Sequence, residues 1–144
     1  AYLLGLWGSA RFHFKPEDII IIGARSYQES EKRHLQDLGV KIYWQQDIDV
    51  RGIVTIMEEA YMTLKQKHMY LGLSIDLDAF DPLQIPAVGY REPNCIATKG
   101  FLQFMQNHHK TDFISYEIAE FNPIRDIEGR TATFIGELLA SLKI

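Results

Sequence analysis

Three carboxylates follow an apolar stretch, and their spacing suggests a cation site. The stretch Met69–Ile75 is apolar except for Ser74, and Asp76, Asp78 and Asp81 come directly after it. A compact apolar run of this kind is typical of a strand buried on both faces of a sheet. Side chains two apart in a strand share a face, so Asp76 and Asp78 are predicted to leave the sheet together, roughly 7 Å apart. Two such carboxylates repel each other unless a cation lies between them, so a metal site is predicted.

The elements around these residues are predicted to place them at one edge of a sheet. Strands are predicted at 19–22, 40–44, 69–78 and 112–121, and helices at 28–38, from 53, from 98 and at 128–142. This alternation predicts an α/β fold with a three-layer α/β/α arrangement around a parallel sheet. Ligands bind such sheets at the carboxyl ends of the strands, so Asp76, Asp78 and Glu120 are expected to converge there.

Several other polar residues have simpler interpretations. Asp81 is expected to tie down the loop 79–97, whose length without structure of its own suggests a functional role. Asp47 and Asp49 precede a strongly amphipathic helix and are expected to cap it, as Thr98 is for the next helix. Glu117 is expected to face away from Glu120 and to pair with a lysine or arginine. Arg25, after the first strand, is interpreted equally well as an ion-pair former or as a substrate contact.

Composition excludes several classes of protein. The chain has 144 residues, of which 47% are hydrophobic and 24% charged, and its net charge is −4. Residues 1–144 are therefore predicted to form a single domain. No basic cluster suggests a nucleic-acid or anionic-membrane partner, and every apolar run is too short to span a membrane. The single cysteine, Cys95, excludes an internal disulfide and indicates a reducing compartment, so a cytoplasmic location is expected.

Three motifs, in order along the chain, carry a resemblance to a known family. Residues 74–82, with Pro86 and Gly89, resemble the C-terminal signature of the ureohydrolases, which include arginase, agmatinase, guanidino-acid hydrolases and formimidoylglutamase. Residues 22–26 resemble the Gly-x-Arg turn of this family, and residues 117–123 resemble its Glu-x-Asn-Pro strand end. The resemblance covers residues 16–144. It implies an arginase-like fold, of which this chain would be a single partial domain, the C-terminal half.

The resemblance also implies a function and a ligand set. It implies a binuclear manganese hydrolase in which Asp76 bridges two Mn²⁺ ions, Asp78 binds the second ion, and Glu120 pairs with the guanidinium or amidine group of the substrate. Oxygen ligands suit manganese or magnesium, and a carboxylate binds a guanidinium through charge-assisted hydrogen bonds. The implied partners are a small guanidino or formimidoyl substrate and further copies of the chain, in a trimer or hexamer.

The sequence also departs from the family pattern. The Gly-Gly-Asp-His and Asp-Ala-His-x-Asp segments that complete the metal shell in the family do not occur here, so the site is expected to be incomplete. Ser26 and Gln28 stand where arginases place acidic residues that face the amino group of arginine, although Glu31 could contribute. Arg91 could instead meet a substrate carboxylate. Arginine, agmatine, a guanidino acid and formimidoylglutamate therefore stay open as substrates.

Two other functions remain open. The chain could be a catalytically inactive family member or fragment that acts as a binding or oligomerisation module. It could also be an Asp-x-Asp phosphotransferase, although no glycine loop that would cradle a phosphate is present. A partial sheet is further expected to expose an apolar edge and to associate.

Overall fold

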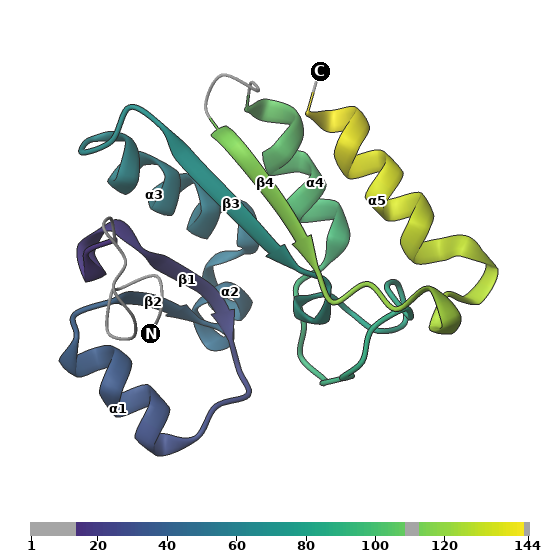
Figure 1. The fold of residues 1–144 in the computed structure, drawn as a ribbon, viewed down its shortest axis with the longest axis horizontal. Coiled ribbons are helices and arrows are strands. Elements are labelled where there is room, and N and C mark those ends of the chain that lie inside the picture. Colours follow the sequence, from purple (N-terminus) through teal and green to yellow (C-terminus); the bar gives the residue numbers. More distant parts are fainter. Residues whose placement is uncertain (1–13, 109–112, 143–144) are drawn as a thin grey trace, which may run out of the picture.

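Strands and helices alternate along the chain in the computed structural model, which describes residues 14–108 and 113–142 (Figure 1). The described elements are β1 (Ile20–Ala24), α1 (Glu29–Asp37), β2 (Lys41–Trp44), α2 (Gln45–Arg51), α3 (Ile53–Lys65), β3 (Leu71–Asp76), α4 (Thr98–Asn107), β4 (Phe113–Ala119) and α5 (Arg130–Ser141). The predicted order is confirmed, with one addition. Two helices follow β2, because Gly52 adopts a positive φ of 80° and separates α2 from α3.

The described strands form two parallel pairs rather than one continuous sheet. β1 pairs with β2, and β3 pairs with β4, both in parallel register. The arrowheads of β1, β3 and β4 point the same way in Figure 1, so their carboxyl ends lie at the same end of the molecule. The parallel topology predicted from the alternation is therefore confirmed within each pair, whereas no hydrogen bonds between the described residues of β1 and β3 join the pairs.

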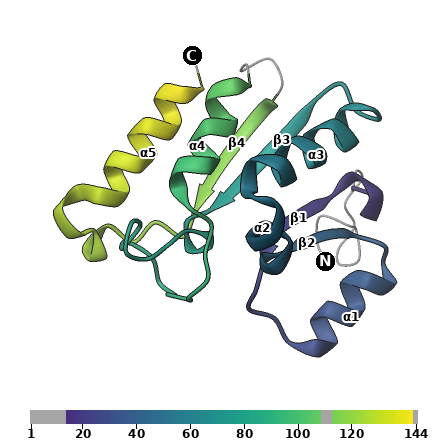
Figure 2. The same cartoon turned by 180° about the vertical axis from the view of Figure 1, so that it is seen from behind.

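Helices cover one face of the β3–β4 pair. In Figure 2 the helices α3 and α4 lie in front of these strands, and the opposite view in Figure 1 shows the strands uncovered by described helices. Leu71 and Ile75 of β3 are buried, whereas Gly72, Ser74 and Asp76 are exposed. The prediction that this strand is buried on both faces is therefore wrong for the described residues, because its alternate side chains are small or polar and face outward.

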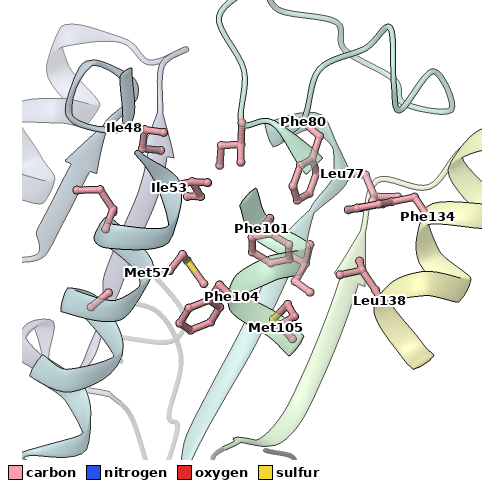
Figure 3. Close-up of a cluster of buried hydrophobic side chains, with 14 of the residues drawn as sticks. Ile48, Ile53, Met57, Leu77, Phe80, Phe101, Phe104, Met105, Phe134 and Leu138 are labelled. Carbon is pink, nitrogen blue, oxygen red and sulfur yellow. The ribbon is translucent and has the colours of Figure 1, made fainter. Parts of the chain in front are cut away.

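The core lies between the sheet pairs and the helices packed on them (Figure 3). Phe80, from the loop after β3, is at its centre with 2% of its surface exposed. Its ring packs edge-on against Phe101 of α4 and Phe134 of α5, with centroid separations of 5.2 and 5.0 Å. Edge-to-face pairs stabilise a core beyond the area that they bury. The long loop is thus anchored at its start by an aromatic cluster.

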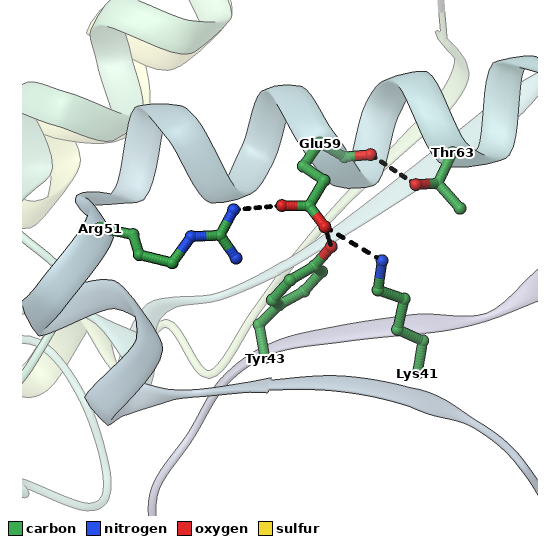
Figure 4. A network of polar contacts seen from close by, with 5 residues as sticks. All are labelled: Lys41, Tyr43, Arg51, Glu59 and Thr63. Carbon is green, nitrogen blue, oxygen red and sulfur yellow. Dashed lines mark hydrogen bonds and ion pairs between the residues drawn. The ribbon is translucent and has the colours of Figure 1, made fainter.

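A polar network joins β2 to α3 (Figure 4). Glu59 accepts hydrogen bonds from Tyr43 at 2.7 Å and Lys41 at 3.3 Å, and it pairs with Arg51. These contacts hold the pKa of Glu59 at about 2, chiefly through Arg51 and then Tyr43. The network therefore fixes the helix on the strand whenever Glu59 is ionised.

The predicted helix caps differ from those observed. Thr98 is the first residue of α4, and its hydroxyl donates to Oε1 of Gln84 at 2.8 Å. Asp47 and Asp49 lie inside α2, and the N-cap of the following helix α3 is Gly52. Asp47 still helps to begin α2, because its carboxylate accepts the main-chain N–H of Trp44 at 2.7 Å. No helix in the described part of the chain combines the length and the apolar character that a membrane span requires.

Candidate functional site

Four charged residues gather at the carboxyl ends of three strands. Arg25 follows β1 directly, Asp76 ends β3, and Glu120 follows β4 directly. Asp78 lies in the short 3-10 turn Leu77–Ala79 after β3. Asp76, Glu120 and Arg25 all lie close enough to Asp78 to shift its pKa. Parallel strands bring their carboxyl ends to one edge, which is why residues distant in sequence meet here.

The chain turns between the two aspartates. Asp76 is the last residue of β3, and the main-chain N–H of Asp78 donates to its Oδ1 at 2.9 Å. The prediction that both side chains leave the same face of one strand is therefore wrong, because Asp78 already belongs to the 3-10 turn. Asp76 is exposed and Asp78 is half-buried. In this turn the main chain of Asp78 is hydrogen-bonded to the carboxylate of Asp76, so the period of a strand does not set the relation between the two residues.

The carboxyl group of Asp78 is in an unfavourable position for a negative charge. Its pKa is raised above the ordinary value, first by burial and then by the negative charges of Asp76 and Glu120. The main-chain N–H of Tyr90 and the Arg25 guanidinium act in the opposite direction. Among the described residues, Oδ1 of Asp78 is buried and accepts no hydrogen bond. A buried acceptor without a partner is costly, and a cation would satisfy it.

Arg25 forms no ion pair within the described chain, and its role toward a substrate stays a prediction. Its Nη2 donates to the main-chain oxygen of Asp78, rather than to a carboxylate. Its Nε is buried and has no partner among the described residues. Because 53 positions separate the two residues, this contact joins the end of β1 to the turn after β3.

Glu120 adopts an unusual backbone conformation. Its φ is 65°, in the left-handed region that residues with a side chain rarely occupy. The main chain of Gly89 lies beside its carboxylate, since a Cβ at position 89 would be 3.9 Å from Oε2. Strained backbone of this kind is frequent at functional sites, where the surrounding contacts maintain it.

The loop facing Glu120 is held by residues that sequence reasoning missed. Arg125 donates to the carbonyl oxygens of Val88 and Gly89 at 3.1 and 2.9 Å. The hydroxyl of Thr131, which is fully buried, accepts the main-chain N–H of Ala87 at 3.1 Å. Nothing in the local sequence pattern identifies either contact, because both partners lie more than 30 residues away.

Three other polar residues can be compared with their predicted roles. Asp81 ties down the loop as expected, because its Oδ1 accepts the N–H of Leu83 at 2.9 Å. Glu117 was expected to pair with a lysine or arginine, but it accepts the hydroxyl of Ser74 at 2.6 Å on the exposed face of the sheet. Arg91 donates to the carbonyl of Pro86 at 2.7 Å, and its role toward a substrate stays a prediction.

A cavity of about 590 Å³ lies next to these carboxylates, between β1 and β3. Consecutive residues of both strands line it, 20–24 on one side and 73–76 on the other, and Asp78 and Arg25 lie at its polar end. Its remaining walls are mostly apolar. The cavity therefore lies between the facing edges of β1 and β3, and residues of the candidate site form part of its wall.

The described residues supply part of a metal shell. Residues 14–108 and 113–142 contain no group of three or more His, Cys, Asp or Glu side chains that could hold a metal ion. Asp76 and Asp78 nevertheless fit a share of such a shell, since the charge of Asp76 acts on Asp78 and Oδ1 of Asp78 has no donor within the described chain. Hard cations such as Mn²⁺ and Mg²⁺ favour carboxylate oxygens.

Comparison with known proteins places the chain in a family. The model of the arginase family matches residues 8–143. The chain belongs to the arginase family. It is 34% identical over 135 residues to the arginase of Bacillus caldovelox, and this match covers 89% of the chain and 43% of that protein. The chain thus spans less than half the length of the curated relatives that it matches.

Solved structures show the same fold. The structure of the Bacillus caldovelox arginase matches with a TM-score of 0.83 over 89% of this chain and 43% of that one. The agmatine ureohydrolase of Thermoplasma volcanium matches with a TM-score of 0.72 at 25% identity, covering 86% of this chain and 40% of its own. The formimidoylglutamase of Bacillus subtilis matches with a TM-score of 0.81 at 19% identity, over 90% and 41%, which supports the fold alone. The arginase-like α/β fold predicted for this chain is confirmed, as a partial fold.

Proposed function

We propose that this arginase-family chain is part of a metal-dependent ureohydrolase that cleaves a C–N bond of a small guanidino or formimidoyl compound. The gathering of Asp76, Asp78 and Glu120 at the carboxyl ends of β3 and β4 carries this proposal. Family membership supports it, because the chain retains these three carboxylates in the motifs that resemble those of ureohydrolases. The proposal includes manganese, for which carboxylate oxygens are suitable ligands.

Each residue has a separate role in this proposal. Asp76 and Asp78 would hold the Mn²⁺ ions through their carboxylate oxygens, one of which, Oδ1 of Asp78, has no donor among the described residues. When bound, the ions would lower the pKa of a water between them and stabilise the negative charge that develops during hydrolysis. Glu120 would accept hydrogen bonds from the guanidinium or amidine and hold its carbon toward the two aspartates.

The surrounding contacts support these roles. The left-handed backbone of Glu120 turns the chain at the end of β4, and its carboxylate lies near Gly89 and Asp78. The loop on which Gly89 lies is held by Arg125 and Thr131. A fixed loop opposite a fixed carboxylate would hold a planar group in one orientation, which contributes to catalysis by positioning.

The remaining metal ligands would come from outside the described residues. The cavity between β1 and β3 exposes strand edges on both sides and ends at Asp78. A strand that pairs with both edges would join the two sheet pairs and bring its own carboxyl end to the site. We propose that further sequence, of the kind present in the longer relatives, completes the sheet and the metal shell together, so that residues 1–144 form one partial domain.

The proposal is tested by metal analysis and by activity assays with Mn²⁺ on the purified whole protein, which includes the further sequence proposed above. Arginine, agmatine and a guanidino acid are assayed for release of urea, and formimidoylglutamate for release of formamide. We expect hydrolysis of one of these compounds, with loss of activity of at least a hundredfold in Asp76→Asn and Glu120→Gln. Asp37→Asn, a change on the exposed end of α1, is the control. Full activity of both site variants would refute the proposed roles.

A non-catalytic binding or oligomerisation module is the second candidate. It is favoured by the absence of a complete metal cluster among the described residues and by the uncovered face of β3 and β4. Sedimentation with and without Mn²⁺ separates the two functions. Stable trimers or hexamers without bound metal would favour the module, whereas two ions per chain would favour the hydrolase.

A further inference from the structure

The main chain of Asp78 is held on both sides. Its N–H donates to Oδ1 of Asp76 at 2.9 Å, and its carbonyl oxygen accepts a hydrogen bond from Nη2 of Arg25. The turn around it contains three residues, and within the described chain it is closed by a main-chain hydrogen bond from the N–H of Phe80 to the carbonyl of Leu77 at 3.2 Å. So short a turn provides little rigidity of its own. The side chains of Asp76 and Arg25 add to it, beside the N–H of Ile96, which donates to the carbonyl of Ala79 at 3.0 Å.

We infer that Arg25 is a positioning residue that sets Asp78 as a metal ligand, an inference that rests on the proposed function. The guanidinium holds the carbonyl of Asp78, and the carboxylate of the same residue thereby keeps its place beside Asp76. Arg25 approaches from β1, so it ties the position of the ligand to the other sheet pair across the cavity. It contacts the main chain of the ligand and not the reacting atoms.

The chemistry of arginine suits this task. Its guanidinium is planar and its donors have a fixed arrangement, whereas the ammonium of lysine is a single point on a flexible stem. The Arg25 side chain is partly buried, and its Nε is shielded from solvent without a partner among the described residues. The hydrogen bond from Nη2 to the carbonyl oxygen of Asp78 therefore holds this partly buried guanidinium in position.

Charge and geometry predict opposite effects on metal affinity. The positive charge of Arg25 near the aspartates would by itself repel a cation, so its removal would strengthen metal binding. The hydrogen bond to Asp78 keeps the ligand in place, so its removal would weaken metal binding. Arg25→Lys keeps the charge and loses the planar donor set. Arg25→Met loses both.

The first measurement is amide hydrogen exchange on the purified whole protein, including the further sequence proposed above, without metal. We expect the amides of Asp78 and Ala79 to exchange about tenfold faster in both Arg25 variants, because a hydrogen bond from a charged group contributes about that factor. The amides of β1 and α3 should keep the wild-type rates. Arg130→Lys is the matched control, since Arg130 pairs with Glu128 on the surface. Faster exchange throughout the protein would overturn the inference, because Arg25 would then stabilise the whole fold.

The second measurement is the affinity of the same proteins for Mn²⁺ alone, determined by isothermal titration calorimetry. Weaker binding in Arg25→Lys by about tenfold supports a positioning role. Unchanged Mn²⁺ affinity in Arg25→Lys with higher affinity in Arg25→Met would overturn the positioning role of Arg25. That result would leave the proposed metal site intact. Absence of Mn²⁺ binding in the wild type, or binding that Asp76→Asn leaves unchanged, would refute the proposed metal site itself and this role of Arg25 with it.

Discussion

Asp76 accepts the main-chain N–H of Asp78 at 2.9 Å while its negative charge raises the pKa of that same residue. The side chain of Asp76 thus holds the main chain of Asp78 in place and opposes the ionisation of the Asp78 carboxyl group. The two carboxylates are maintained together by the turn and by Arg25, although their charges repel. Sites arranged for a cation are often costly to stability when the cation is absent.

We therefore predict that Asp78→Asn stabilises the protein in the absence of metal at neutral pH. The pKa of Asp78 is raised in the folded state, so ionisation destabilises the fold as pH rises from the unfolded value of 3.8. The gain should be at most about 1 kcal/mol, because solvent screens a half-buried group. Urea unfolding in EDTA at pH 7 and at pH 3 measures it, with Asp37→Asn as the exposed control. An equal gain at both pH values would contradict the electrostatic explanation.

Glu59 should give the opposite dependence on pH. Its pKa is lowered from 4.5 to about 2 by Arg51, Tyr43 and Lys41, so its contribution to stability is complete above pH 4.5 and is lost as pH falls toward 2. Glu59→Gln should remove this part of the acid transition. Urea unfolding of both proteins between pH 6 and pH 2 provides the comparison. Glu128→Gln, which changes an exposed ion pair with Arg130, is the control.

Phe80→Ala should destabilise the protein by about 3–5 kcal/mol, the range for removal of a buried aromatic ring. The ring contacts Phe101 and Phe134, and its loss would also release the start of the loop that carries Gly89. Chemical denaturation at pH 7 measures the change. Leu83→Ala in the same loop, at a residue that is 81% exposed, should change stability by less than about 0.5 kcal/mol. Equal effects of the two changes would show that the aromatic cluster does not anchor the loop.

Glu120→Gly should be more stable than Glu120→Ala by about 1 kcal/mol. The φ of 65° at this position favours glycine, which adopts left-handed backbone without a steric penalty. Both changes remove the carboxylate, so the difference between them isolates the backbone. Thermal unfolding of the two variants measures this difference. Greater stability of the alanine variant would mean that the backbone at this position relaxes when the side chain is removed.

Much of the fold and part of the site could be predicted from local sequence patterns. Apolar runs, helical periodicity and turn residues depend on neighbours in the chain, which is why the order of strands and helices was predicted correctly apart from α2. Local patterns also predicted that Asp76 lies at the end of a strand and that Asp81 ties down the loop after it. The resemblance of residues 74–82 to a family motif was also a property of the sequence alone, and the family assignment confirmed it.

Tertiary structure decided what depends on distant partners. Arg25 binds the main chain of Asp78, Glu117 meets Ser74 rather than a basic residue, and Arg125 holds the loop of Gly89. The pairing of strands, and the face of β3 that no described helix covers, also depend on which elements meet in space. Periodicity shows that a side chain needs a partner but does not identify that partner, because the energy of the contact arises only when segments far apart in the chain fold together.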